Sequence, residues 1–284
     1  MPKNELPTII DPYTNELRVL GTIPSDPRLV ASIPPYTGTL LPESELQEFN
    51  DYPDHLEIKD QNGKGACNGF ATAAALEQTR YVQGMKHVPL SGWFTYAILC
   101  NGRDVGSNIL QAYAQAQEIG VAPESTVDYG IINPKNLTPR AHKEAQKYRL
   151  RVGASYQSWR QIVSSVMLRE NLNLSVCVGR NFNNLDQEGV AGLDRGPGNH
   201  AVTVGLGLKK SKRWGWLVLM RNSWSPRWGQ SGFCYLAEAH IEAGSYFECF
   251  SVHQVSEDLE ANELPPIAKL LANLPRKATW TPVS

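Results

Sequence analysis

Residues 59–70 read KDQNGKGACNGF, and the single cysteine in this stretch decides the fold. From Cys67 onward, apolar or small residues recur at offsets 3, 4, 7 and 8, followed by Gln78 at offset 11, which is the spacing of one helix face. Gly84 is a plausible end for that helix. Taken alone, the stretch fits two interpretations. Cys67 is either a small buried residue that opens a helix or a nucleophile exposed by the glycine-rich loop before it.

Composition favours neither nucleic acid nor a membrane as a partner. The chain has 284 residues, with 27 basic and 28 acidic side chains and a formal net charge of −1. This balance gives no electrostatic reason to expect nucleic acid or an anionic membrane as a partner. Residues 1–30 lack the apolar run of a signal peptide, and no stretch is long enough for a membrane span. We therefore expect a soluble protein that stays in its compartment of synthesis.

The cysteine pattern predicts a reducing compartment and no metal. Five cysteines stand at wide, irregular spacings, and no CxxC pair occurs. An odd number of thiols needs no explanation in the cytosol. We predict a cytoplasmic protein without a metal or cofactor.

The order of the segments predicts an α+β protein with two lobes. Residues 1–45 are rich in proline and form an extended arm, and 257–284 form a tail. Helical patterns follow Cys67, Asn108 and Ser158, whereas short β-branched and aromatic runs begin after Leu172. A helical lobe is expected over about 46–160 and a β lobe over about 161–256, with a cleft between them.

The residues around Cys67, His200 and Asn222 fit nucleophilic catalysis. A reactive cysteine needs a base and a helix N-terminus, and the Cys67 N–H with the Gln61 side chain can face an oxyanion. Among the six histidines, His200 alone follows a Gly-Pro-Gly loop at the start of a strand. Asn222 ends the next strand, where Trp224 and Trp228 can shield an Asn–His hydrogen bond.

These segments together resemble the papain-like cysteine peptidases. DQNGKGACNGFA, NHAVTVGLG and RNSWSPRWGQSGF are similar to the glutamine–cysteine, histidine and asparagine segments of that family, in the family order. Cys67 and His200 are 133 residues apart, within the range of about 130–150 typical of papain-like enzymes. The resemblance implies a helical N-terminal lobe, an antiparallel β-sheet or barrel C-terminal lobe and an active-site cleft between them.

The resemblance also implies residue roles. Cys67 is expected as the nucleophile and a thiolate at rest, and His200 as the base and later the acid. Asn222 is expected to hold the imidazole, and Gln61 with the Cys67 N–H to form the oxyanion hole. The residues expected to line the substrate site are Gly106, Ser107, Asn199, Ala201 and Trp224.

Several positions depart from the family pattern. Asn68 replaces the usual tryptophan after the nucleophile, Lys64 replaces a half-cystine, and Ser225 replaces a glycine. The proline-rich first 45 residues do not resemble the helical inhibitory prosegment of lysosomal relatives, so control by a prosegment is not expected. The sequence pattern of the chain is closer to that of bacterial or bacteriophage members of the family.

We therefore predict a thiol protease that cleaves peptide or related amide bonds through an acyl-enzyme on Cys67. The alternative is a catalytically silent structural or adaptor protein of the same fold, docked through its terminal segments in a larger assembly such as a virion. A third possibility keeps the chemistry but changes the bond, as in cell-wall amide hydrolysis or transglutaminase-like acyl transfer. A cleft plugged by residues 1–45 is the feature expected of the adaptor.

Overall fold

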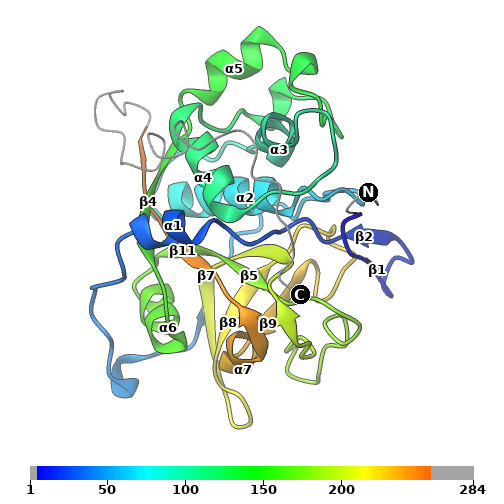
Figure 1. Ribbon diagram of the computed structural model, residues 1–284. Coiled ribbons are helices and arrows are strands. Elements are labelled where there is room, and N and C mark those ends of the chain that lie inside the picture. The colour runs from blue at the N-terminus through cyan, green and yellow to red at the C-terminus, as the bar shows by residue number, and fades with distance from the viewer. Residues whose placement is uncertain (1–4, 257–284) are drawn as a thin grey trace.

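The computed structural model describes residues 5–256 and joins a helical part to an antiparallel sheet (Figure 1). The sheet order is β4-β11-β5-β7-β8-β9, and every neighbouring pair runs antiparallel. The predicted α+β class is confirmed. The predicted tail, 257–284, lies outside the described residues.

The central helix α2 begins at the cysteine that decides the fold. It spans Cys67–Val82, and the residues from Cys67 to Arg80 are all buried. Gly84 follows with a φ of +69°, as its predicted role at the helix end requires. The other helices of this part are α3 (Gly92–Cys100), α4 (Ile109–Glu118) and α5 (Pro139–Ala145).

Two of these helices show why local patterns succeed or fail. Asn108 and Gln111 form a reciprocal capping box at the start of α4, so its predicted start at Asn108 is confirmed. The α3 helix was not predicted, because its nine residues are mostly apolar and lack a polar face. Only the Ser91 hydroxyl, which accepts a hydrogen bond from the Phe94 N–H, marks its start.

The sheet forms the lower part of the molecule in Figure 1. Its strands are β4 (Arg149–Ser155), β5 (Asn171–Val176), β7 (His200–Ser211), β8 (Gly215–Arg221), β9 (Phe233–Leu236) and β11 (Cys249–Ser256), with β3 (Phe49–Asn50) paired to β7. Helix α6 (Trp159–Met167) contacts this sheet, and Ser158 caps it as predicted. Smaller elements are β6 (Gly196–Pro197), α7 (Glu238–Ala243), β10 (Gly244–Tyr246) and the 3-10 turns at Glu124–Thr126 and Pro134–Asn136.

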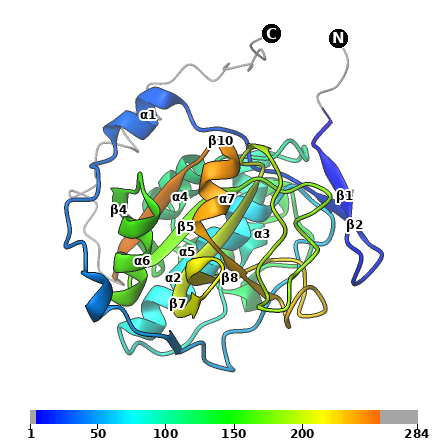
Figure 2. The same cartoon turned by 90° about the horizontal axis from the view of Figure 1, so that it is seen from below.

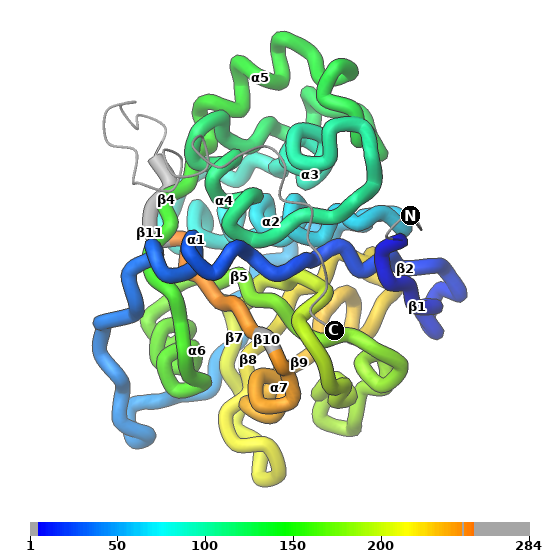
Figure 3. The backbone as a smooth tube through the Cα atoms, viewed as in Figure 1, coloured from blue at the N-terminus to red at the C-terminus, as the bar shows by residue number. Residues whose placement is uncertain are grey.

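The N-terminal residues run along the junction between the helices and the sheet. A hairpin of β1 (Thr8–Ile10) and β2 (Leu17–Val19) leads through an extended segment to α1 (Pro27–Ser32) and a 3-10 turn at Glu43–Glu45. Figure 3 shows this blue segment crossing in front of α2 and β5, and Figure 2 shows the hairpin at one edge of the molecule. None of the helices among residues 5–256 has the length and apolarity needed to cross a membrane.

Candidate active site

Cys67 lies at the N-terminus of α2, where the loop before it turns sharply. Asn62 and Gly63 take left-handed backbone conformations, with φ of 44° and 62°. Ala66, the residue at the cap, offers no side-chain acceptor to the first turn, so the helix N-terminus faces the site with its own N–H groups. The Cys67 side chain is nonetheless fully buried.

His200 and Asn222 meet at the ends of adjacent strands. β7 begins at His200, and β8 ends one residue before Asn222. His200 Nε2 lies 2.8 Å from Asn222 Oδ1, and the Trp224 ring lies 4.5 Å from the imidazole. Trp228 contacts Trp224 edge-on rather than the histidine, with their ring centroids 5.6 Å apart. Trp224 therefore covers the Asn–His pair directly, and Trp228 supports it from behind.

One nitrogen of the imidazole has no partner among the described residues. Nδ1 of His200 is buried and has no hydrogen-bond partner among residues 5–256. The sulfur of Cys67 is hydrogen-bonded by the backbone of Ala201, the next residue after His200. Since Nε2 is held by Asn222, Nδ1 is the nitrogen available for proton exchange with the thiol.

Burial keeps both groups neutral in this conformation. It raises the pKa of the Cys67 thiol, and the hydrogen bonds from Thr22 and the backbone only partly offset it. Burial also lowers the pKa of His200 to about 4, against the hydrogen bond to Asn222, and the charge of Arg18 lowers it further. The expectation of a thiolate at rest is therefore wrong for this state, because the site is closed to water.

Residues 19–23, the occluding segment, are the reason that Cys67 is closed off. Thr22 Oγ1 lies 3.2 Å from Cys67 Sγ, and the Thr22 N–H donates to the Asn199 carbonyl at 2.9 Å. The Ser107 N–H donates to the Gly21 carbonyl and its carbonyl accepts from the Ile23 N–H, both at 2.9 Å. An extended segment held by backbone groups thus covers the thiol, although residues 1–45 lack the helical pattern of the family's inhibitory prosegment.

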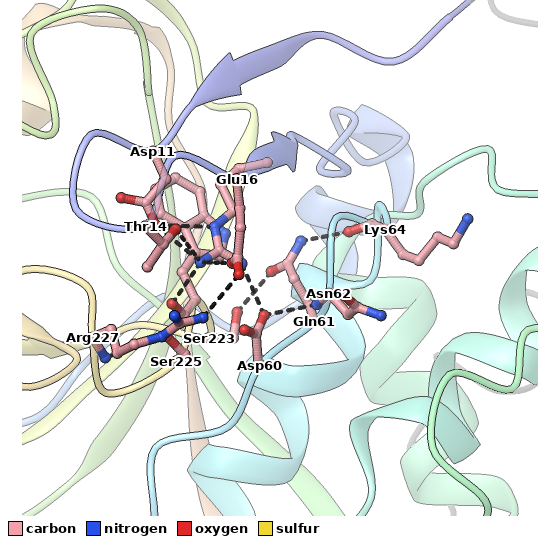
Figure 4. A network of polar contacts seen from close by, with 12 residues as sticks. Asp11, Thr14, Glu16, Asp60, Gln61, Asn62, Lys64, Ser223, Ser225 and Arg227 are labelled. Carbon is pink, nitrogen blue, oxygen red and sulfur yellow. Dashed lines mark hydrogen bonds and ion pairs between the residues drawn. The ribbon is translucent and has the colours of Figure 1, made fainter.

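Asn68 and Lys64, which both depart from the family pattern, differ in whether their side chains contact the occluding segment. Asn68 Nδ2 donates to the Ser107 carbonyl at 2.7 Å and to the Thr22 hydroxyl at 3.2 Å. Lys64 contributes its carbonyl, which accepts from Gln61 Nε2 at 2.6 Å, while its side chain points away (Figure 4). Asn68 therefore helps to seat the occluding segment, and the Lys64 side chain does not.

Gln61 is buried beside Cys67, and its amide is already engaged. Its Oε1 accepts from the Ser223 hydroxyl at 2.8 Å, which fixes the orientation of the amide. Its Nε2 donates to Lys64 and, at 3.2 Å, to the carbonyl of Val19 in the occluding segment. A carbonyl of the chain itself thus takes the donor that was predicted for an oxyanion.

A buried arginine ties the N-terminal hairpin to the loop before Cys67. Arg18 is fully buried and forms ion pairs with Asp11 and Asp60 at 2.9 Å and with Glu16 at 2.8 Å. It also donates to the Trp224 carbonyl at 3.0 Å. Figure 4 shows the acidic partners gathered around this point. Nothing in the proline-rich pattern of residues 1–45 indicated this anchor.

The predicted substrate-site residues are only partly brought together. Gly106, with φ of 71°, and Ser107 face the occluding strand, and so does the Asn199 backbone. Ala201 is buried against Cys67 in the core, and Trp224 packs on the imidazole. No group of three or more metal-ligating side chains occurs among the described residues.

Ser225 stands where the family has a glycine. Its backbone conformation is strained for a residue with a side chain. Its φ is 70°, a left-handed conformation that glycine adopts freely. Its N–H donates to the Lys59 carbonyl at 3.1 Å, which holds this turn against the loop before Cys67.

Comparison with known proteins agrees with this geometry. The family model described as "Papain family cysteine protease" matches residues 50–251. A cathepsin B-like protein of Giardia intestinalis is 24% identical over 69% of this chain and 70% of its own length. Zingipain-2 of Zingiber officinale is 26% identical over 68% of this chain and 90% of its own.

Solved structures show the same fold. Xylellain, a cysteine protease from Xylella fastidiosa, superposes with a TM-score of 0.64 at 19% identity, covering 83% of this chain and 96% of its own. The procathepsin B S9 from Trypanosoma congolense superposes with a TM-score of 0.56 at 19% identity, over 79% and 84%. The predicted two-lobed fold is confirmed.

Proposed function

Because the chain belongs to the papain family of cysteine proteases and is a thiol protease, we propose that Cys67 is its nucleophile and His200 its general base. Asn222 holds the imidazole, and Gln61 with the Cys67 N–H forms the oxyanion hole. The observation that carries these roles is the Asn222–His200 pair, which leaves Nδ1 without a partner, while Ala201, the next residue, lies against Cys67 at a helix N-terminus.

Catalysis follows from this arrangement once the site is open. Water entering the site removes the burial that keeps Cys67 and His200 neutral, and a proton passes from the thiol to Nδ1. The thiolate attacks the substrate carbonyl carbon, and the oxyanion takes the Gln61 Nε2 and Cys67 N–H donors. His200 then gives its proton to the leaving amine, and water, deprotonated by the same nitrogen, hydrolyses the thioester.

The enzyme is latent in this conformation, because its own N-terminal segment fills the positions that a substrate needs. The Val19 carbonyl accepts a hydrogen bond from Gln61 Nε2, and the Thr22 hydroxyl covers the Cys67 sulfur. Gly21 and Ile23 pair with the backbone of Ser107. Peptides are therefore expected to be cut only after residues 19–23 leave.

A single glycine offers a way to open the full-length protein. A Cβ on Gly21 would lie 2.0 Å from the Gly65 carbonyl oxygen, so Gly21→Val must push the segment outward. Ala31→Val places the same side chain at an exposed position of α1 and is the matched control. We expect Gly21→Val to hydrolyse fluorogenic peptides, Ala31→Val to resemble the wild type, and Gly21→Val with Cys67→Ala to be inactive. Hydrolysis that survives Cys67→Ala would overturn the assignment.

The occlusion also favours a second function, that of a structural or adaptor protein that keeps the fold with a plugged site. In that case Gly21→Val would open the site without giving any hydrolysis or any reaction with an epoxide warhead. Cell-wall amide hydrolysis and acyl transfer are separated from peptide cleavage by the product formed, since only acyl transfer incorporates an added amine.

A bacterial or bacteriophage origin, a cytoplasmic location and assembly contacts through the terminal segments complete the proposal. The five free cysteines support a reducing compartment. Proximity labelling from a tag on the chain in its host tests the location. Recovery of periplasmic or extracellular neighbours would contradict it.

A further inference from the structure

An open apolar groove of about 340 Å³ lies beside α1, where the N-terminal arm meets the end of β4. Its lining is mostly apolar and includes Pro27, Val30, Ile33 and Pro35 from the arm and Ser155 from β4. The Tyr36 N–H donates to the Ser155 carbonyl at 2.9 Å, so the arm and the strand form one continuous surface here. Pro27 and Pro35 are exposed. An exposed apolar surface of this kind favours an apolar occupant.

Ser256, the last described residue, lies at the opposite end of β4 from the groove. Ser256 of β11 pairs with Arg149, whereas Phe250 of β11 pairs with Ser155 at the groove. The path along β4 from Arg149 to Ser155 is about 20 Å long, at about 3.3 Å per residue. Residues 257–266 can span up to about 33 Å when extended, so the chain after them is long enough to reach the groove.

The surface along this path carries positive charge. Residues 135–151 contain six lysine and arginine residues and one acid, Glu144. Arg149 and Arg151 lie on one face of β4, since the buried Leu150 between them points to the core on the other face. Nε of Arg149 is buried and has no hydrogen-bond partner among the described residues. An acidic segment is the occupant that complements this surface.

The sequence after Ser256 has both required properties, in the order that the path requires. Residues 257–263 read EDLEANE, with four acids and no base. Residues 264–275 read LPPIAKLLANLP, and four apolar side chains stand there at the spacing of one helix face, offsets 0, 3, 4 and 7: Ile267, Leu270, Leu271 and Leu274. The acidic part therefore comes first, beside the basic surface, and the apolar part comes second, within reach of the groove.

We propose that residues 257–274 dock on their own chain as a clasp between the end of β11 and the N-terminal arm. The acidic part lies along the Arg149 face of β4, and the apolar face of 267–274 fills the groove beside α1. Burial of the apolar side chains provides the affinity, and the charge pairs fix the position of the segment along β4. The clasp does not depend on the roles proposed for Cys67 and His200.

Photo-crosslinking in the full-length protein tests this placement. p-Benzoylphenylalanine is introduced in place of Leu271 in one protein and in place of Thr279, outside the clasp, in another. Mass spectrometry then locates the adducts. We expect the probe at 271 to crosslink to residues 27–35 about tenfold more than the probe at 279, the ratio for a docking preference of about 1.4 kcal/mol.

A mixture of isotopically light and heavy chains separates docking within a chain from docking on a second copy. Crosslinks between 271 and 27–35 should join peptides of the same isotope. Mixed-isotope crosslinks, adducts mainly at other parts of the chain, or equal yields from the two probes would overturn the proposal.

A charge reversal tests the basic surface in the protein with the probe at 271. Arg149→Glu should lower the yield of the crosslink about threefold or more, as the loss of one charge pair beside Ser256 allows. Adding Glu257→Arg and Asp258→Arg should restore the yield, which also shows that the Arg149→Glu chain folds. Arg213→Glu, at an arginine that is 69% exposed in the turn between β7 and β8, is the control and should change nothing. A yield that Arg149→Glu leaves unchanged, or a loss that the reversed acids do not restore, contradicts the clasp.

Discussion

Two segments meet at Cys67, and they differ in how they use their residues. The loop 60–66 acts through particular side chains and conformations, such as the Gln61 amide and the left-handed Asn62–Gly63 turn. Residues 19–23 act almost entirely through backbone groups, which pair with Ser107, Asn199 and Gln61. The chemistry of the site therefore depends on particular residue types, whereas its occlusion depends mostly on the path of the backbone.

The largest expected effect concerns the catalytic side of this comparison. In the opened Gly21→Val protein, His200→Ala should lower kcat by about 10³- to 10⁴-fold, because the thiol loses its proton acceptor. Asn222→Ala should cost less, since Asn222 orients the ring without transferring a proton. Peptide hydrolysis measures both. An Asn222→Ala loss equal to or larger than that of His200→Ala would contradict the assigned roles.

The next largest effect concerns how the loop before Cys67 is held to helix α2. Glu77 on α2 is buried and pairs with Lys59 at 2.7 Å and Arg221 at 3.0 Å, and these cations keep the pKa of Glu77 low despite its burial. Glu77→Gln leaves Arg221 without its anion and Lys59 with only the Glu124 carboxylate, at 3.2 Å, and should lower the free energy of unfolding by about 3 kcal/mol. Urea unfolding measures it, with exposed Glu43→Gln as the control. A change below about 0.5 kcal/mol would show that the triad does not hold the loop.

A smaller effect is expected on the occluding side. Arg18→Gln leaves Asp11 and Asp60 without their buried cation and should weaken the seat of the N-terminal segment by about 3 kcal/mol or less. Alkylation of Cys67 should then be faster, and adding Asp11→Asn should restore part of the stability. Arg28→Gln removes an exposed arginine from the same region and should change nothing. An unchanged rate of alkylation in Arg18→Gln would remove Arg18 as the anchor.

The smallest expected effect is that acid lowers the stability of the occluded state. His200 has a pKa of about 4 when buried, against about 6.5 when solvated, so the occluded state is at full stability above about pH 6.5 and loses it as pH falls towards about 4. At pH 5 the loss reaches about 2 kcal/mol at most. Melting temperature against pH measures it, and His200→Gln should flatten the profile between pH 6.5 and 5. The window of Glu77 lies lower, because its pKa is below the usual value for a carboxyl group.

The same difference explains what the sequence could reveal. The helix at Cys67, the capped helices at Asn108 and Ser158 and the strands that carry His200 and Asn222 all have side-chain signals, and these predictions are confirmed as elements of the fold. The α3 helix escaped because it is almost entirely apolar. The occluding segment was not predicted because backbone hydrogen bonds leave no side-chain pattern in the sequence. Arg18 and Gly21 contact Asp60 and Gly65, which lie far along the chain, so their roles were not visible either.

The rate at which Cys67 reacts with iodoacetamide tests the central claim most directly, that residues 19–23 conceal a competent nucleophile. The wild type, Gly21→Val and Ala31→Val are treated at pH 7.5, and mass spectrometry follows the adduct on Cys67. We predict that Gly21→Val reacts at least about tenfold faster than the other two, because an opening cost of about 1.4 kcal/mol is already a factor of ten. Equal rates in all three proteins would contradict the account.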